Sequence, residues 1–98
     1  MARTQDAVDR INYLMGFDTT RRSTPKTITG DQNAILSYGL TIIERVTTPL
    51  NDDIYMVHPR DNSATTNRHI TAARSALMSQ GFAVLRVDSA GFEFFTRV

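Results

Sequence analysis

The sequence lacks cysteine and tryptophan altogether, and Lys26 is its single lysine. Without cysteine, neither a disulfide framework nor a thiolate metal site can form, and this is typical of proteins from a reducing compartment. No apolar run approaches the roughly 20 residues that a membrane-spanning helix needs, and the first residues lack the apolar core of a secretion signal. We therefore expect a cytoplasmic protein that does not enter a membrane.

An excess of either charge is also absent, because eleven basic and ten acidic residues leave a net charge of +1. A strongly electrostatic nucleic-acid binder would carry a marked basic excess. Ten of the eleven basic residues are arginine, which reflects either the codons of a GC-rich genome or a need for planar groups that bind phosphate, carboxylate or stacked ligands. Hydrophobic residues at 41% and charged residues at 21% are ordinary globular values, so residues 1–98 predict a single domain.

The first third of the chain predicts a short helix and then a long loop. Val8, Ile11 and Met15 form an apolar stripe at helical spacing within residues 4–15. This stripe either packs on the sheet or meets another subunit. The periodicity disappears over residues 17–30, which we interpret as a basic loop. Its cations are Arg21, Arg22 and Lys26. Such a loop is usually solvated surface, and the alternative is that its cations contact phosphate or a partner.

The remaining residues, 34–98, predict a β-β-α-β-β body. Alternation over residues 34–47 indicates one half-buried strand, which a turn connects to a second strand at 54–58. The residues of the apolar parity are Leu36, Tyr38, Leu40, Ile42 and Val46, and Glu44 is the exception. Residues 31–36 also fit a short helix, and the sequence leaves this choice open.

A helix and a second hairpin follow. Ile70, Ala73 and Leu77 recur at helical steps, and Gly81 suits the residue after a helix end. Alternating residues over 82–98 then predict two strands joined by a turn. The predicted fold class is therefore α+β in the order α-β-β-α-β-β, with an antiparallel sheet and helices packed on one face. Phenylalanine on both faces of the last strand, together with the first helix's stripe, predicts a homo-oligomer, most simply a dimer.

The start of the second helix is the main candidate for ligand binding. Its residues are Ser63, Thr65, Thr66, Asn67, Arg68 and His69. A helix N-terminus presents free backbone N–H groups and a partial positive charge, which suit phosphate or carboxylate. These side chains either cap the helix alone or cap it and also contact a ligand. Arg68 and His69 favour the second interpretation, because cations at this end of a helix are unfavourable unless an anion offsets them.

Catalytic patterns are weak in this sequence. There is no cysteine nucleophile and no serine in a Gly-x-Ser-x-Gly turn. His58 or His69 can serve as a base, but no partner for either is evident. A metal site made of both histidines and Asp61 matches no standard ligand spacing. We therefore expect neither an enzyme nor a cofactor.

Two segments carry a resemblance to a known family. Residues 37–43 read Ser-Tyr-Gly-Leu-Thr-Ile-Ile, and residues 63–70 read Ser-Ala-Thr-Thr-Asn-Arg-His-Ile. They resemble small uncharacterised proteins of tailed phages, in which a Ser-Tyr-x-Thr-x-Ile strand precedes a Thr-Thr-x-x-His helix start. The matching residues are Ser37, Tyr38, Thr65, Thr66 and His69. The chain departs from this pattern at Leu40, which is an extra residue between Gly39 and Thr41. The resemblance implies a phage origin and the host cytoplasm, and it implies no established activity.

These observations together predict a small phage-encoded accessory protein that interferes with a host system. It would mask a host protein or sequester a small anionic ligand such as a signalling nucleotide. Candidate contacts to phosphate or a partner outside the helix start are Arg21, Arg22, Lys26 and Tyr38. A nucleic-acid-binding module is the first alternative, because the basic loop and the helix start can grip phosphates jointly. A nucleotide-acting enzyme is the second.

Overall fold

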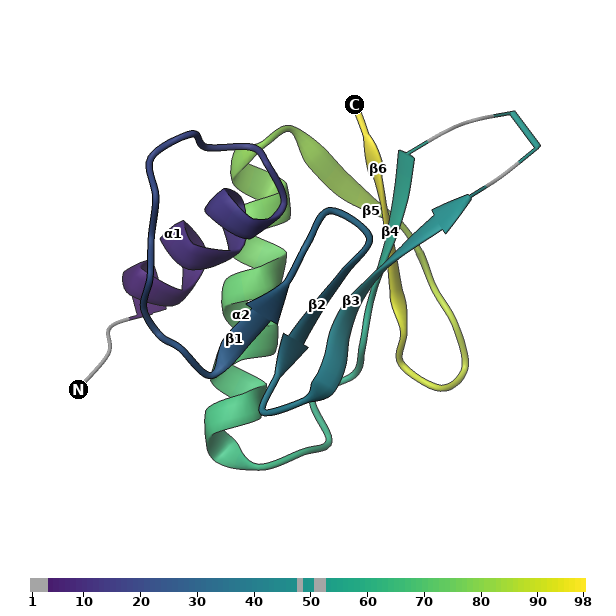
Figure 1. Cartoon of the computed structure of the whole chain (residues 1–98). Helices are drawn as coiled ribbons and strands as arrows, with labels where there is room; N and C mark the ends of the chain where they lie inside the picture. The colour runs from purple at the N-terminus through teal and green to yellow at the C-terminus, as the bar shows by residue number, and fades with distance from the viewer. Residues whose placement is uncertain (1–3, 48, 51–52) are drawn as a thin grey trace.

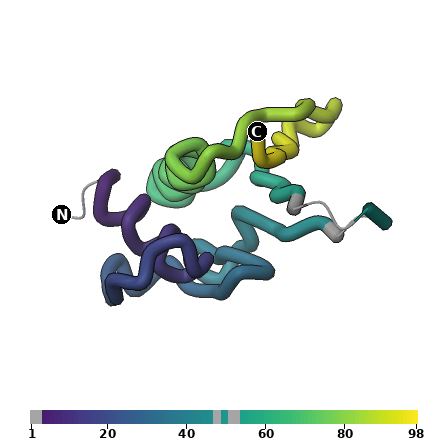
Figure 2. Tube along the Cα trace, turned by 90° about the horizontal axis from the view of Figure 1, so that it is seen from above, coloured from purple at the N-terminus to yellow at the C-terminus, as the bar shows by residue number. Residues whose placement is uncertain are grey.

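Two helices pack against one face of a six-stranded antiparallel sheet in the computed structural model of this chain (Figure 1). The structure describes residues 4–47, 49–50 and 53–98. The elements are α1 (Thr4–Leu14), β1 (Ile28–Gly30), β2 (Ala34–Ser37), β3 (Leu40–Thr47), β4 (Asp53–Val57), α2 (Ala64–Ser79), β5 (Phe82–Val87) and β6 (Glu93–Arg97). The order of strands across the sheet is β1-β2-β3-β4-β6-β5, and every neighbouring pair is antiparallel. Viewed from above, the sheet curves and both helices lie on the same side of it (Figure 2). The α+β class is therefore confirmed.

The single strand predicted over residues 34–47 is wrong, because the chain turns back at Tyr38 and Gly39 and forms the β2–β3 hairpin. The φ angles of these two residues are +52° and +80°, the left-handed values that a two-residue type I′ turn requires. Asn-Gly would have signalled such a turn, whereas tyrosine rarely adopts positive φ. The turn also leaves Tyr38 and Leu40 exposed, although their parity predicts a buried face. Residues 34–37 are strand, which resolves the choice left open for 31–36.

A further strand lies inside the segment predicted as the basic loop. β1 pairs with β2, and its first residue, Ile28, is fully buried. The observed order is therefore α-β-β-β-β-α-β-β, with four strands before α2 where the sequence predicted two. A strand of three residues is too short for alternation to reveal it, because the buried face holds a single apolar side chain.

The stripe on α1 is covered by the chain itself. Val8, Ile11 and Met15 are all buried, and α1 packs mainly against α2 and then against β1. The predicted burial of α2 is confirmed, since Ile70 and Leu77 are at most 1% exposed. The α1 stripe therefore gives no reason to expect a second subunit.

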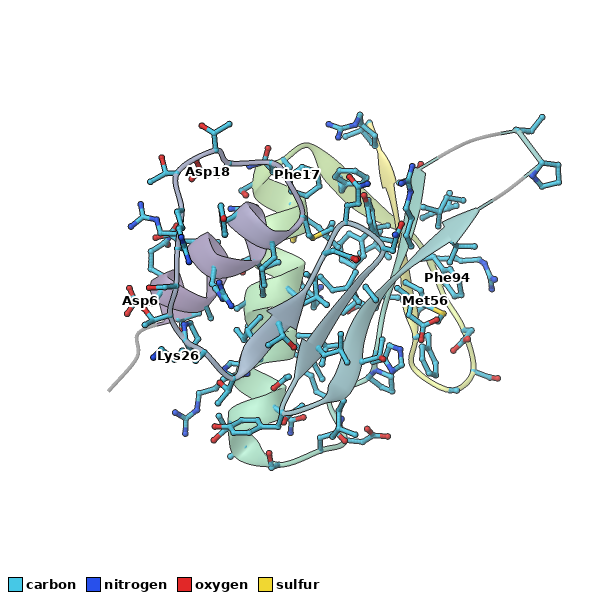
Figure 3. The ribbon with its side chains drawn as sticks, in the orientation of Figure 1. Asp6, Phe17, Asp18, Lys26, Met56 and Phe94 are labelled. Atoms are coloured by element: carbon cyan, nitrogen blue, oxygen red, sulfur yellow. The ribbon has the colours of Figure 1, made fainter. Side chains whose placement is uncertain are left out.

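The two faces of the sheet are covered differently. Phe95 is fully buried beneath the helices, whereas Phe94 and its cross-strand neighbour Met56 lie on the side away from them (Figure 3). The guanidinium of Arg86 lies 4.1 Å from the centre of the Phe94 ring and covers part of it. On the edge strand β5, Leu85 and Val87 are more than half exposed. The homo-oligomer predicted from the phenylalanines of the last strand and from the α1 stripe stays a prediction. Neither described helix is long and apolar enough to cross a membrane.

Candidate functional site

The β2–β3 turn and the first turns of α2 meet in one buried polar cluster. Ser37 Oγ lies 2.7 Å from Nδ1 of His69 and 3.4 Å from Oγ1 of Thr66. Ser37 is completely buried, and the other two residues are less than 9% exposed. The ring of Tyr38 stacks on the imidazole of His69, with the planes 11° apart and the centres 6.0 Å apart. We call Ser37, Tyr38, Thr66 and His69 the Ser37–His69 cluster.

This cluster joins the two segments that carry the phage-protein resemblance. Four of the five matching residues belong to it, and the fifth, Thr65, is half-buried at the start of α2. The two segments are far apart in the sequence, so neither one alone predicts the hydrogen bond between Ser37 and His69. The two residues become partners because the end of β2 packs beside the first turns of α2.

The surroundings of His69 favour the neutral form of its ring. Burial lowers the pKa of His69 below its usual 6.5, and the positive charge of Arg68 lowers it further. The Ser37 hydroxyl has one proton, so it donates to one of its two partners and accepts from the other. Either arrangement satisfies the buried hydroxyl and the imidazole Nδ1 together. This environment does not fit the expectation of His69 as a second cation at the helix start.

The remaining polar groups at the start of α2 serve mainly as caps. Ser63 is the N-cap residue, and its side chain accepts a hydrogen bond of 3.2 Å from the backbone N–H of Thr66. The Asn67 side chain accepts from the backbone N–H of Asn62 and donates to its carbonyl, each at 3.1 Å. Capping therefore accounts for Ser63 and Asn67 without a ligand. Among the six predicted ligand-binding residues, all of which are described, Arg68 carries the exposed charge.

A serine hydrogen-bonded to a histidine has the geometry of a nucleophile and its base. Here the serine faces the core, since Ser37 has no exposed surface and Tyr38 covers the histidine ring. A substrate cannot reach this hydroxyl in the folded structure. The chemical role that fits the geometry is to hold the β2–β3 turn against α2.

Tyr38 is the exposed part of this arrangement. It is 58% exposed although its ring stacks on a buried imidazole, and its backbone N–H donates to the carbonyl of Thr27 at 2.9 Å. That bond brings Thr27, near the end of the basic loop, to the turn. Lys26 precedes Thr27 in the chain, is exposed and lies beside the start of β1 (Figure 3). Arg68 is close enough for its charge to act on His69. We call Lys26, Tyr38 and Arg68 the tip surface.

The other two cations of the basic loop lie farther back along the chain. Arg21 and Arg22 are exposed. Arg10 on α1 fixes this part of the loop, because its guanidinium donates to the carbonyls of Arg22 at 2.6 Å and of Ile28 at 3.0 Å. The loop is therefore anchored through its backbone, and the side chains of Arg21 and Arg22 are exposed.

A groove of about 560 Å³ opens where the β2–β3 turn meets the loops after β4 and after β5. Its polar lining residues are Thr41, Glu44, His58, Asp61 and Asn62, and Phe92 contributes an aromatic ring. His58 Nε2 lies 3.0 Å from a Glu44 carboxylate oxygen, and the His58 ring meets the edge of Phe92 at a centre distance of 4.7 Å. No pattern in the sequence predicts this groove. The one trace of it is Glu44, a charged residue at a position where the alternation over residues 34–47 calls for an apolar one.

Comparisons of the chain with models of protein families, with curated proteins and with solved structures found no match. Within residues 4–47, 49–50 and 53–98, no three histidine or acidic side chains come together in a way that could hold a metal ion. The function of the chain must therefore be argued from its own geometry.

Proposed function

We propose that this chain is a small accessory binding protein of a tailed phage, and that its tip surface masks an acidic surface of a host protein. The observation that carries the proposal is Tyr38, an exposed aromatic residue with a left-handed backbone conformation and a ring that stacks on His69. The phage origin rests on the resemblance of the segments around Ser37 and Thr66.

The conformation of Tyr38 supports a role beyond the turn itself. A left-handed conformation costs a residue with a Cβ about 1–2 kcal/mol, and asparagine or glycine would make the same turn more cheaply. Strain of this kind concentrates at functional sites. The stack on His69 also fixes the ring before a partner arrives, so less side-chain entropy is lost on binding. Tyrosine and arginine are the residue types most enriched among those that dominate binding energy.

Charge and shape support a macromolecular, acidic partner. The tip surface includes the exposed cations Lys26 and Arg68, which would repel a basic partner and attract an acidic one. Tyr38 lies exposed at the turn of the β2–β3 hairpin, whereas a small anion would need a cradle of free donors. The cap at Ser63 already uses the backbone N–H of Thr66, one of the donors that such a cradle would use.

Nucleic acid is the second candidate partner, because Arg21 and Arg22 continue the positive charge of the tip surface back along the basic loop. The net charge of +1 favours the protein partner. Salt separates the two, since binding that depends on several phosphate contacts weakens steeply and linearly on a logarithmic salt scale. A nucleotide-acting enzyme is the weakest candidate because Ser37 is buried.

The test compares two substitutions of one residue. Tyr38→Phe keeps the ring, whereas Tyr38→Asn removes it and keeps a residue that suits the turn. We expect the wild type and Tyr38→Phe to retain one and the same host protein from a lysate, measured by native mass spectrometry, and Tyr38→Asn to lose it. Arg68→Glu should also lose it, through charge. Leu85→Thr, a change on the distant edge strand β5, serves as the control.

Equal retention of that protein by Tyr38→Asn and the wild type would overturn the proposal. Retention of nucleic acid in place of a protein, with a steep loss between about 50 and 200 mM salt, would replace the protein partner with the second candidate.

A further inference from the structure

The groove beside the β2–β3 turn is lined by Gly39 and Leu40 but shares no residue with the tip surface, and its charged side chains are acidic. Its volume of about 560 Å³ is within the range of about 300–1,000 Å³ that is typical of small-molecule sites. Two carboxylates, Glu44 and Asp61, line it, and no lysine or arginine is among the described lining residues. The aromatic ring of Phe92 and the methylene-rich ring of Pro59 supply apolar contact.

The hydrogen-bonding groups of the groove are mainly acceptors. An ionised carboxylate can only accept hydrogen bonds. When His58 is neutral, the bond from its Nε2 to Glu44 requires the proton on Nε2, and its Nδ1 is then an acceptor as well. A ligand that satisfies these groups must carry several N–H donors.

The loop after β4 forms one wall of the groove. Asp61 of this loop lines the groove, whereas the guanidinium of the preceding residue, Arg60, donates to the Thr71 hydroxyl on α2 at 3.2 Å. Asp61 instead accepts a hydrogen bond of 3.3 Å from the side-chain amide of Asn62, and Glu44 pairs with His58. The described lining therefore has two carboxylates and no lysine or arginine, an acidic character that suits a cationic ligand.

We infer that this groove binds a small organic cation, with a guanidinium or primary amine placed between Glu44 and Asp61 and its carbon chain against Phe92. The two carboxylates supply charge and paired acceptors for the cation, and charge-assisted bonds of this kind are roughly twice as strong as neutral ones. The inference does not depend on the tip surface or on any protein partner.

The test uses agmatine, which carries a guanidinium and a primary amine on a short carbon chain, as the probe. N-butylurea is the matched neutral probe, since it keeps the planar donors and the alkyl chain without charge. We expect saturable binding of agmatine by the purified full chain, measured by calorimetry and by shifts of the His58 and Phe92 NMR signals. N-butylurea should bind at least about tenfold more weakly, which is about 1.4 kcal/mol.

Two variants and a control locate the binding. Glu44→Gln keeps an acceptor oxygen for His58, and Asp61→Asn changes an exposed loop residue, so both should fold. Each should weaken agmatine binding by about tenfold or more. Asp9→Asn removes the same charge from α1, far from the groove along the chain, and should leave the affinity within about twofold. Absence of saturable binding, or equal affinities for wild type, Glu44→Gln and Asp61→Asn, would overturn the inference.

Discussion

The two histidines both lie against the β2–β3 hairpin, yet their surroundings are opposite. His69 is 7% exposed, bonded to the hydroxyl of Ser37 and covered by Tyr38. His58 is partly open to the groove and bonded to the carboxylate of Glu44. Burial favours the uncharged form of the His69 ring and lowers its pKa.

This difference separates a structural role from a ligand-facing one. The His69 ring joins the hairpin to α2, and it is buried with Tyr38 stacked on one face. The His58 ring presents the edge of a groove that is large enough for a small molecule. The same residue type therefore stabilises the fold in one place and shapes a candidate site in the other.

The largest expected effect comes from deleting each ring in turn. His69→Ala should lower the free energy of unfolding by about 2–4 kcal/mol, because it opens a cavity and leaves the buried Ser37 hydroxyl with a single partner. His58→Ala should cost about 1 kcal/mol or less, because a partly exposed ion pair contributes little. Urea denaturation of both variants measures the two costs. Equal losses of stability would contradict the division of roles.

The sequence predicted the pieces of this comparison but not their pairing. α2 was predictable because Ile70, Ala73 and Leu77 repeat at helical steps, and the last hairpin was predictable from its alternation and its Gly91 turn. Ser37 and His69 each match the resemblance to the phage proteins. The hydrogen bond between them, however, depends on how β2 is placed against α2, which no local pattern encodes.

The groove was hidden for a related reason. Glu44, His58 and Phe92 come from β3, the end of β4 and the loop before β6. They become neighbours because β6 inserts next to β4 in the sheet, and a strand order cannot be obtained from periodicity. The missed β2–β3 turn had a local cause, since Tyr38 stands where asparagine would have revealed it.

The structural role of His69 can also be tested by varying the pH. The folded pKa of His69 lies below 6.5, so below pH 6.5 the unfolded chain binds a proton more readily than the folded chain does. The contribution of a neutral His69 to stability is complete above pH 6.5 and is lost as the pH falls toward the folded pKa. The slope from one such group is at most about 1.4 kcal/mol per pH unit.

The matched measurement compares the wild type with His69→Gln, which cannot titrate in this range. Urea denaturation at pH 7.5, 6.5 and 5.5 should show the wild type losing more stability than the variant as the pH falls. The difference between the two curves removes the contribution of carboxylates and of His58. Parallel curves would mean that burial does not hold His69 neutral, and the role assigned to its bond with Ser37 would fail.

The smallest expected effect concerns Tyr38, the residue with a left-handed backbone conformation whose ring stacks on His69. Tyr38→Asn relieves a left-handed strain of about 1–2 kcal/mol and loses an aromatic stack worth about 0.5–1.5 kcal/mol, so its stability should stay within about 1 kcal/mol of the wild type. Tyr38→Ala loses the stack and keeps the strain, and should be the less stable variant by about 1 kcal/mol. Urea denaturation of Tyr38→Asn and Tyr38→Ala measures the backbone strain as the difference between their free energies of unfolding. If Tyr38→Ala is as stable as Tyr38→Asn, the turn carries no such strain, and the reason for regarding Tyr38 as more than a turn residue disappears.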